Sequence, residues 1–325
     1  MAQPLLELKQ LQTYFISAGG TRVVKAVDGV SFTLDEGETL GIVGESGSGK
    51  TVTSLSILRL LPTAARIVGG EVRFAGENLL TKSEREMRRI RGSQITMILQ
   101  DPMMSLNPLF TIGEQIAEPL RIHRHMHGNP LVERIKDLLR GVRIPSPEVR
   151  MGEYPHQMSG GMRQRIVGAI SISCEPRLII ADEPTTSLDV TIQAQYLKLL
   201  KDIQQRSKVA MIFITHNIGI VARMCDNVAV MYAGRVVERA PVRTIFNQPA
   251  HPYTEALLHA VPKLTERTDR LWSIEGQPPD LASLPPGCPF QPRCPKAEDR
   301  CLKEIPPEFH VGDNHYTRCW LWEKR

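Results

Sequence analysis

The sequence predicts an α/β fold built around a largely parallel sheet. Strand-like and helix-like stretches alternate through about the first 235 of its 325 residues, as in strands joined by covering helices. Four short apolar runs each end on polar residues, the point where such sheets build their sites. The length corresponds to roughly two domains, which is ample for a hydrophobic core without disulfides.

The first of these runs, Leu40–Val43, predicts a strand that leads into a glycine-rich turn and then into a helix from Thr51 to Leu61. The other three runs predict further strands at Ile95–Leu99, Leu178–Ala181 and Val209–Ile214. Residues from about 103 to 175 carry helical patterns, 111–124 and 130–140, that prolines interrupt. This stretch therefore predicts a helical insertion.

The end of the chain has a different composition. Val228–Tyr232 and Arg235–Glu238 predict a hairpin, and a helix is expected from His251 to Ala260 with a proline near its start. Between Gln277 and Pro307 lie nine of the 24 prolines, so little regular structure is expected there. We therefore expect a main domain over 1–240 and a small extension over 241–325, which a metal would help to fold.

Composition excludes several classes of protein. Hydrophobic residues at 42% and charged residues at 23% are close to globular averages, which excludes disorder and fibrous folds. The net charge of +5, from 40 basic and 35 acidic residues, is too evenly mixed to indicate nucleic-acid binding. No apolar run reaches the length of about 18 residues that a membrane span needs. Charged residues appear within Met1–Lys9, too early for the apolar segment of a signal peptide. The sequence predicts a soluble, cytosolic chain.

A phosphate-binding loop follows the first predicted strand. Residues 44–51 match the pattern G-x-x-x-x-G-K-[ST]: Gly44, Glu45, Ser46, Gly47, Ser48, Gly49, Lys50 and Thr51. The backbone N–H groups of such a loop wrap nucleotide phosphates, with Lys50 on the outer phosphates and Thr51 on Mg²⁺. The positive end of the following helix faces the same anion. The pattern predicts a nucleotide site.

Polar residues that follow the other strands complete the expected site. Asp182 ends one strand and suits the Mg²⁺ shell, and Glu183 beside it suits orienting or deprotonating a water. Gln100 and His216 end two further strands, where Gln100 suits the metal or the water and His216 suits the γ-phosphate. A second anion-binding nest, Ser159-Gly160-Gly161 after Met158, opens another helix.

Together these motifs resemble the ATP-binding cassette (ABC) family over about residues 5–260. In that family the Ser-Gly-Gly signature of one subunit caps ATP held by the phosphate loop of another. The resemblance implies a P-loop NTPase cassette, with a RecA-like core, an antiparallel β lobe and a helical insertion, plus a small cysteine-containing extension. It also implies an ATPase.

The resemblance implies a role for each of the motif residues. Phe15 is expected to stack on adenine, residues 44–51 form the Walker A loop, and Ser159, Gly160 and Gly161 cap ATP. Thr51, Gln100 and Asp182 are expected at Mg²⁺. The expected catalytic residues are Glu183, His216 and Gln100, and Ser187-Leu188-Asp189 is the D-loop.

Within the family, the chain is most similar to the importer ATPases for dipeptides, oligopeptides and nickel. Four segments carry this similarity: Gln100–Pro108, Ala181–Gln195, His251–Thr254 and Gly287–Pro295. It implies a peripheral subunit at the cytoplasmic face of the inner membrane that couples ATP hydrolysis to peptide uptake. Its expected partners are a second ATPase subunit, by family habit a paralogue in a head-to-tail dimer, two membrane permeases and an extracytoplasmic solute-binding protein, with no nucleic acid. Met103 and Met104 are expected in the permease groove, with packing in the hydrophobic core as the alternative.

Four of the six cysteines crowd the last 38 residues: Cys288, Cys294, Cys301 and Cys319. In a reducing compartment such a cluster indicates a metal more than disulfides. Four thiolates suit zinc or an iron–sulfur cluster, and some related peptide-importer ATPases carry a [4Fe–4S] centre here. The wide spacing favours the cluster, with zinc and metal-free thiols as alternatives. Cys174 and Cys225, in apolar contexts, are expected to be small core residues.

Two other functions remain open at this point. A soluble ABC ATPase acting on nucleic acid or ribosomes would usually carry two cassettes in one chain or a long coiled coil, and neither is present. An ATP-binding regulator with the thiols as sensor is disfavoured by Glu183 and His216. The basic stretch Arg85–Arg91 could bind phosphates of nucleic acid or lipid, but it is interpreted as a solvated helix face.

Overall fold

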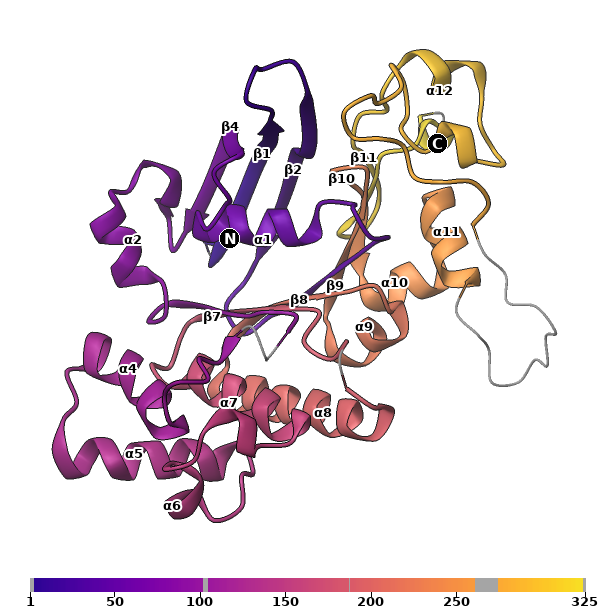
Figure 1. Cartoon of the computed structure of the whole chain (residues 1–325). Helices are drawn as coiled ribbons and strands as arrows, with labels where there is room; N and C mark the ends of the chain where they lie inside the picture. The colour runs from indigo at the N-terminus through magenta and orange to yellow at the C-terminus, as the bar shows by residue number, and fades with distance from the viewer. Residues whose placement is uncertain (1–2, 102–104, 187, 261–273, 324–325) are drawn as a thin grey trace. The chain divides into compact units, whose positions relative to one another are not determined.

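The computed structural model describes residues 3–101, 105–186, 188–260 and 274–323. The chain forms two compact units (Figure 1). The first contains residues 1–34, 39–80 and 214–325, and the second contains 35–38 and 81–213.

The helices and strands of the first unit come from both ends of the chain. Its strands are β1 (Leu6–Ile16), β2 (Val23–Leu34), β3 (Thr39–Val43), β4 (Ala65–Phe74), β5 (Glu77–Asn78), β9 (Asn227–Tyr232), β10 (Arg235–Pro241), β11 (Phe309–Gly312) and β12 (His315–Thr317). Its α-helices are α1 (Lys50–Leu58), α9 (Ile218–Met224), α10 (Val242–Asn247), α11 (Pro252–His259) and α12 (Asp299–Lys303), and a short 3₁₀ turn, η3, covers Gln291–Arg293.

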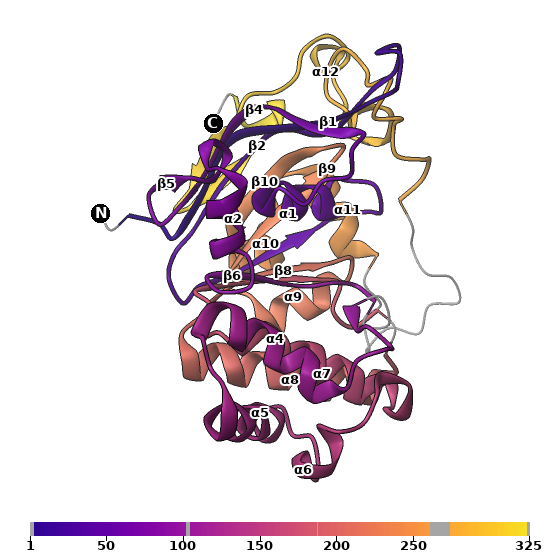
Figure 2. The same cartoon turned by 60° about the vertical axis from the view of Figure 1, so that its left-hand side comes forward.

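An antiparallel sheet in the order β2-β1-β4-β5 opens this unit, with β1, β2 and β4 side by side in both views (Figures 1 and 2). It forms because apolar side chains such as Leu6 and Leu8 alternate along β1 and are fully buried. The expected antiparallel β lobe is therefore confirmed.

The phosphate loop follows a buried parallel strand. β3 pairs in parallel with β9, and β9 continues antiparallel through β10 and β12 to β11. The predicted hairpin is thus confirmed as β9–β10. The helix expected over Thr51–Leu61 ends at Leu58, because Arg59 turns into the left-handed conformation with φ of 54°.

The terminal hairpin β11–β12 was missed, although α11 and the shortage of regular structure before Pro307 were expected. β12 pairs with the edge of β10, and buried His315 lies 2.8 Å from Glu238 of that strand. Pairing across 77 residues leaves no local signal, which is why the pattern of the sequence did not indicate it.

The second unit consists of a few buried strands and a group of helices. It holds α2 (Glu84–Ile90), β6 (Ile95–Ile98), α4 (Ile112–Arg124), α5 (Gly128–Gly141), α6 (Pro147–Arg150), α7 (Gly160–Ile172), β7 (Leu178–Asp182) and α8 (Val190–Ser207), and it ends within β8 (Ala210–Thr215). The helices α4 to α8 gather together (Figure 2). β6 and β7 are parallel, so the predicted strands and the predicted helical stretch are confirmed to within a few residues. Among the helices that the structure describes, none combines the length and apolar character needed to cross a membrane.

Candidate active site

The phosphate loop is shaped by glycines that no other residue can replace. Gly44 has φ of 156°, and a Cβ there would overlap the carbonyl oxygen of Met231 on β9. Gly49 has φ of 100°, and a Cβ there would overlap the carbonyl oxygen of Ala26 on β2. The loop therefore packs its backbone directly against two strands at these glycines.

The phosphate loop carries polar side chains that could donate hydrogen bonds to an anion. Lys50 is buried, and its Nζ donates to the carbonyl oxygens of Gly44 at 2.8 Å and Glu45 at 2.9 Å. Ser48 Oγ is buried and has no hydrogen-bond partner among the residues that the structure describes. Thr51 is exposed in the first turn of α1. This donor set and the glycine cradle fit a nucleotide phosphate.

Two residues from the end of the chain hold Glu45 of the loop. The Glu45 N–H donates to Tyr253 Oη at 2.9 Å, and the Arg293 guanidinium donates to both Glu45 carboxylate oxygens at 2.8 and 3.0 Å. Sequence reasoning missed both contacts. The only signal was that both residues lie in segments that resemble the importer extension, and a separation of 208 and 248 residues hides the pairing.

The first unit also contains two other expected site residues, Phe15 and His216. Phe15 is half-buried on β1, opposite Val24 of β2 and Ala65 of β4. His216 follows β8 and is exposed just before α9.

The second unit brings Gln100 and Glu183 together. They follow the parallel strands β6 and β7, so both lie at the same edge of the sheet, and Gln100 Nε2 donates to Glu183 Oε2 at 3.3 Å. Thr186 Oγ1 donates to the same oxygen at 3.1 Å. Glu183 has φ of 45°, a strained backbone typical of functional positions, and Asp182 before it is buried.

The Ser-Gly-Gly segment caps α7. Ser159 Oγ accepts from the N–H of Met162 at 3.3 Å, and both Ser159 and Gly160 are exposed. A Cβ on Gly161 would lie only 2.7 Å from Ile192 Cγ2 in α8, so a larger residue here would force Ile192 to shift. Asp189 of the expected D-loop caps α8 through the N–H of Ile192 at 3.0 Å, whereas Ser187 lies outside the described residues.

Gln164 is a site-forming residue that sequence reasoning missed. It is fully buried in α7, and its Nε2 donates to the carbonyl oxygen of Pro184 at 2.8 Å. The bond ties the Ser-Gly-Gly helix to the loop that carries Glu183. The adjacent signature motif was the only sequence signal for it.

The expected site thus divides between the two units. The first unit holds the phosphate loop, Phe15 and His216, and the second holds Gln100, Asp182, Glu183 and the Ser-Gly-Gly segment. The expected Mg²⁺ ligands Thr51, Gln100 and Asp182 offer hydroxyl, amide and carboxylate oxygens. These are the hard donors that Mg²⁺ prefers, so the donor chemistry fits the ion.

The four terminal cysteines line one cavity of about 20 Å³, with room for about one water molecule. Burial raises the pKa of Cys288 to about 11 and that of Cys319 to about 12, and the neighbouring thiols add to both shifts. Within the described ranges no three His, Cys, Asp or Glu side chains are arranged to hold a metal ion. The thiols therefore share a cavity without a preformed metal geometry. Of the other two cysteines, Cys174 is buried and Cys225 is partly buried, close to Gly41 on β3.

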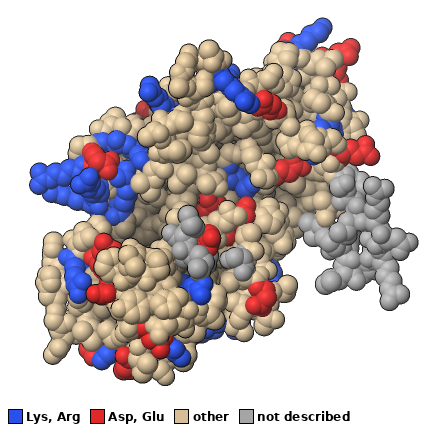
Figure 3. Space-filling model, viewed as in Figure 1, with Lys and Arg blue, Asp and Glu red and all other residues tan. Residues whose placement is uncertain are grey.

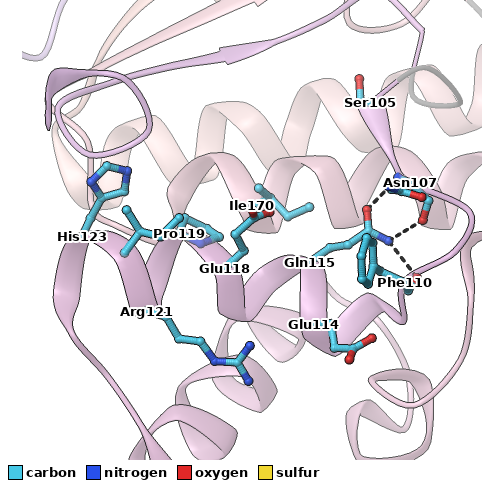
Figure 4. Close-up of a pocket in the computed structure, with 11 residues that line it drawn as sticks. Ser105, Asn107, Phe110, Glu114, Gln115, Glu118, Pro119, Arg121, His123 and Ile170 are labelled. Carbon is cyan, nitrogen blue, oxygen red and sulfur yellow. Dashed lines mark hydrogen bonds between the residues drawn. The ribbon is translucent and has the colours of Figure 1, made fainter. Parts of the chain in front are cut away.

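A larger cavity of about 700 Å³ lies against α4 in the second unit (Figure 4). Its rim is held by Gln115, which accepts from the N–H of Asn107 and donates to the carbonyls of Asn107 and Phe110, each at 2.9 Å. Phe110 and Ile122 line it and are 50% and 59% exposed. The cavity thus offers a few apolar side chains among polar and charged ones such as Glu118 and Arg121.

Basic side chains gather at the place of α2 in the space-filling view (Figure 3). Arg85, Arg88 and Arg89 are exposed there, while Arg91 pairs with Glu84 at 2.5 Å. These exposed arginines are consistent with a solvated helix face.

Comparison with known proteins gives consistent matches along the chain. The family described as ABC transporter matches residues 27–186, and the family described as Oligopeptide/dipeptide transporter, C-terminal region, matches residues 237–301. A probable peptide ABC transporter ATP-binding protein of Sinorhizobium fredii is 50% identical over 98% of this chain and 95% of its own length. The dipeptide transport ATP-binding protein DppD of Bacillus subtilis is 49% identical over 99% of this chain and 96% of its own.

Solved structures agree with the fold. The ATP-binding cassette MJ0796, determined as a dimer in a post-hydrolysis state with ADP and phosphate, superposes with a TM-score of 0.65 at 25% identity. The match covers 73% of this chain and 99% of that one. A cassette fold is therefore shown for most of the chain.

Proposed function

Because the chain belongs to the ATP-binding subunits of peptide ABC transporters, we propose that it hydrolyses ATP to power peptide uptake across the cytoplasmic membrane. Cassettes of this family are ATPases. The main domain is proposed to cover 1–240, with its helical subdomain at 103–175, and the extension to cover 241–325. The family match that begins at residue 237 supports this boundary.

ATP is proposed to bind on the phosphate loop with its adenine on Phe15. Lys50, now bonded to the carbonyls of Gly44 and Glu45, would turn to the outer phosphates. Thr51, Gln100 and Asp182 would hold Mg²⁺, which when bound neutralises charge on the phosphates. The buried Ser48 hydroxyl and the glycine cradle support this placement.

Glu183 is proposed to hold and deprotonate the attacking water, with His216 at the γ-phosphate. The observation that carries this is the hydrogen bond from Gln100 to Glu183, because it orients one carboxylate oxygen and leaves the carboxylate at the edge of the sheet. Thr186 supports the same oxygen. Gln100 would thus link the base to the metal shell.

Replacing Glu183 with Gln tests the proposal. Glu183→Gln is expected to keep ATP binding and to lose at least about 100-fold in ATPase turnover, since a positioned base contributes about 10²–10⁴-fold. Phosphate release and nucleotide binding are measured on the same preparations. Glu175→Gln serves as a control, because Glu175 is an exposed carboxylate of the same unit. Wild-type turnover in Glu183→Gln would refute the assignment.

The partners are proposed from the geometry of the Ser-Gly-Gly segment. Ser159 and Gly160 are exposed at a helix start, which suits capping of ATP on a second ATPase subunit, by family habit a paralogue. The MJ0796 cassette, determined as a dimer, supports pairing with a second subunit, and a head-to-tail arrangement is proposed from the family resemblance. Two permeases, fed by a solute-binding protein, would hold this chain at the cytoplasmic face of the inner membrane, without nucleic acid.

The cavity against α4 is proposed to receive a permease helix. Exposed Phe110 and Ile122 provide its apolar contacts, and Gln115 fixes the loop that carries Phe110. Met103 and Met104, expected beside it, lie outside the described residues.

The cysteine cavity is proposed to hold a [4Fe–4S] centre, with zinc as the alternative. Cys288, Cys294, Cys301 and Cys319 supply four thiols around one cavity, which supports either metal. The thiols would need to move apart for a cluster, because the cavity has room for about one water. When bound, such a centre would cross-link and stabilise a lobe that has little hydrophobic core of its own.

A further inference from the structure

Arg293 joins the C-terminal extension to the phosphate loop. It ends the 3₁₀ turn η3, and its side chain is only 4% exposed. The two terminal guanidinium nitrogens donate to the two carboxylate oxygens of Glu45 at 2.8 and 3.0 Å. A buried, bidentate, charge-assisted pair of this kind is among the stronger polar contacts in proteins.

Glu45 is held at all three of its polar groups. Its N–H donates to Tyr253 Oη at 2.9 Å, its carbonyl accepts from Lys50 Nζ at 2.9 Å, and its carboxylate accepts from Arg293. Two of these three contacts come from residues after position 250. The conformation of the loop at Glu45 therefore depends on the extension.

Arg293 is itself fixed in place. Its Nε donates to the Glu275 carbonyl at 3.0 Å, and its terminal nitrogens reach the Ile274 carbonyl at 3.4 Å and Tyr232 Oη at 3.3 Å. Phe290 at the start of η3 packs against Tyr232, with ring centroids 5.2 Å apart. The guanidinium is thus preorganised for Glu45 and cannot easily follow a shifted carboxylate.

The charge of Glu45 explains why the loop needs this contact. Glu45 belongs to the loop that is proposed to bind the phosphates, and a negative charge in that loop would repel them. Arg293, whose side chain is 4% exposed, neutralises the charge of Glu45, whose side chain is 26% exposed. The same contact keeps the loop backbone, and with it Lys50, in place.

We infer that Arg293 is a positioning residue for ATP binding, which acts through Glu45 so that the C-terminal extension sets the nucleotide affinity of the phosphate loop. This inference rests on the proposed ATP site. A residue that merely anchors the extension would change stability and leave nucleotide affinity unchanged.

Nucleotide affinity of the full-length chain tests the inference, with trinitrophenyl-ATP as the fluorescent probe. Arg293→Gln is expected to raise the Kd at least about fivefold, the lower end of coupling between sites, while kcat at saturating ATP stays at the wild-type value. Glu45→Gln removes the repelling charge and is expected to weaken binding less. The double variant Glu45→Gln/Arg293→Gln is expected to match Glu45→Gln alone.

Lys296→Gln is the matched control. Lys296 lies three residues from Arg293 and pairs with Glu255 inside the extension at 2.6 Å, so its loss is expected to leave the Kd unchanged. If Arg293→Gln does not fold, Arg293→Lys decides the question. Lys keeps the charge without the fork, so an intermediate Kd is expected.

Two results would overturn the inference: a wild-type Kd in a folded Arg293 variant, or a double variant whose loss equals the product of the single losses. A wild-type chain that binds no nucleotide would contradict the proposed function instead. The two failures are therefore distinguishable.

Discussion

At the scale of single residues, Asp28 is a carboxylate of the N-terminal sheet with several partners. Tyr14 Oη donates to it at 2.7 Å, Arg235 of β10 pairs with it at 2.5 Å, and its own N–H donates to the Gly234 carbonyl at 2.8 Å. Burial alone would raise the pKa of this carboxyl, but the Tyr14 hydroxyl and the Arg235 guanidinium hold the pKa below its ordinary value. Asp28 therefore ties β1 and β10 to β2 as a charged group.

Asp28→Asn is expected to lower the free energy of unfolding by about 3 kcal/mol, because it leaves the mostly buried Arg235 without its counter-charge. Denaturant unfolding at neutral pH measures the loss. Glu71→Gln is the control: Glu71 pairs with Arg73 at the surface, where water screens the pair, so its loss should change the free energy of unfolding far less than Asp28→Asn does.

The stability that Asp28 contributes is expected to fall at low pH. Since the pKa of Asp28 is lowered on folding, its stabilisation is fully present above the unfolded pKa of about 3.9 and is lost as pH falls through the folded value. Equal stability of Asp28→Asn and wild type at neutral pH would contradict the role given to this contact.

Single residues were predictable where a local motif names them. The phosphate loop, Glu183 and Gln100 follow from short patterns and from their places at strand ends. Arg293 and Gln164 were not predictable, because their partners lie 248 and 20 residues away and no pattern joins them. Contacts between distant segments depend on the fold, which composition and periodicity do not encode.

At the scale of elements, the predicted helices and strands were those with strong periodicity and clear ends. α4 begins where Thr111 caps it and shares a capping box with Glu114, a signal that is readable in the sequence. The terminal lobe lacks such signals. In this lobe β12 pairs with β10 and with β11, and α12 carries Cys301 of the cysteine cavity. The formation of these short elements therefore depends on contacts with distant parts of the chain.

Metal analysis of this lobe is expected to find about four iron and four acid-labile sulfide per chain, in protein purified without oxygen. Cys294→Ser is expected to lower the metal content and the unfolding temperature of the chain, because the lobe loses its staple. About one zinc per chain would support the alternative centre instead.

Cys225→Ser is the control for metal content, because Cys225 lies near β3 and not in the cysteine cavity. It is expected to keep the metal. Protein that holds neither iron nor zinc would contradict the proposed centre and reduce the lobe to a docking extension.

At the scale of the whole molecule, nucleotide chemistry and permease binding are proposed for different parts of the chain. Nucleotide chemistry is proposed at the strand ends of the two units, while the cavity against α4 offers exposed apolar side chains on the second unit. Exposed apolar groups around a hollow are typical of a docking surface. The fold class could be predicted from motifs, and the ATP site stays a prediction that rests on them. This cavity could not be predicted, because Gln115 fixes the loop that lines it through contacts that no motif encodes.

Ile122→Asp is expected to weaken capture of the chain by its permeases at least about tenfold, since a charge in an apolar contact costs more than about 1.4 kcal/mol. Co-purification from membranes that contain the permeases measures the loss. Val149→Asp is the matched control, because Val149 in α6 is 61% exposed and lies outside the cavity. The unfolding temperatures of the two variants are compared to show that both are folded. Equal capture of Ile122→Asp and Val149→Asp would place the permease contact on another surface.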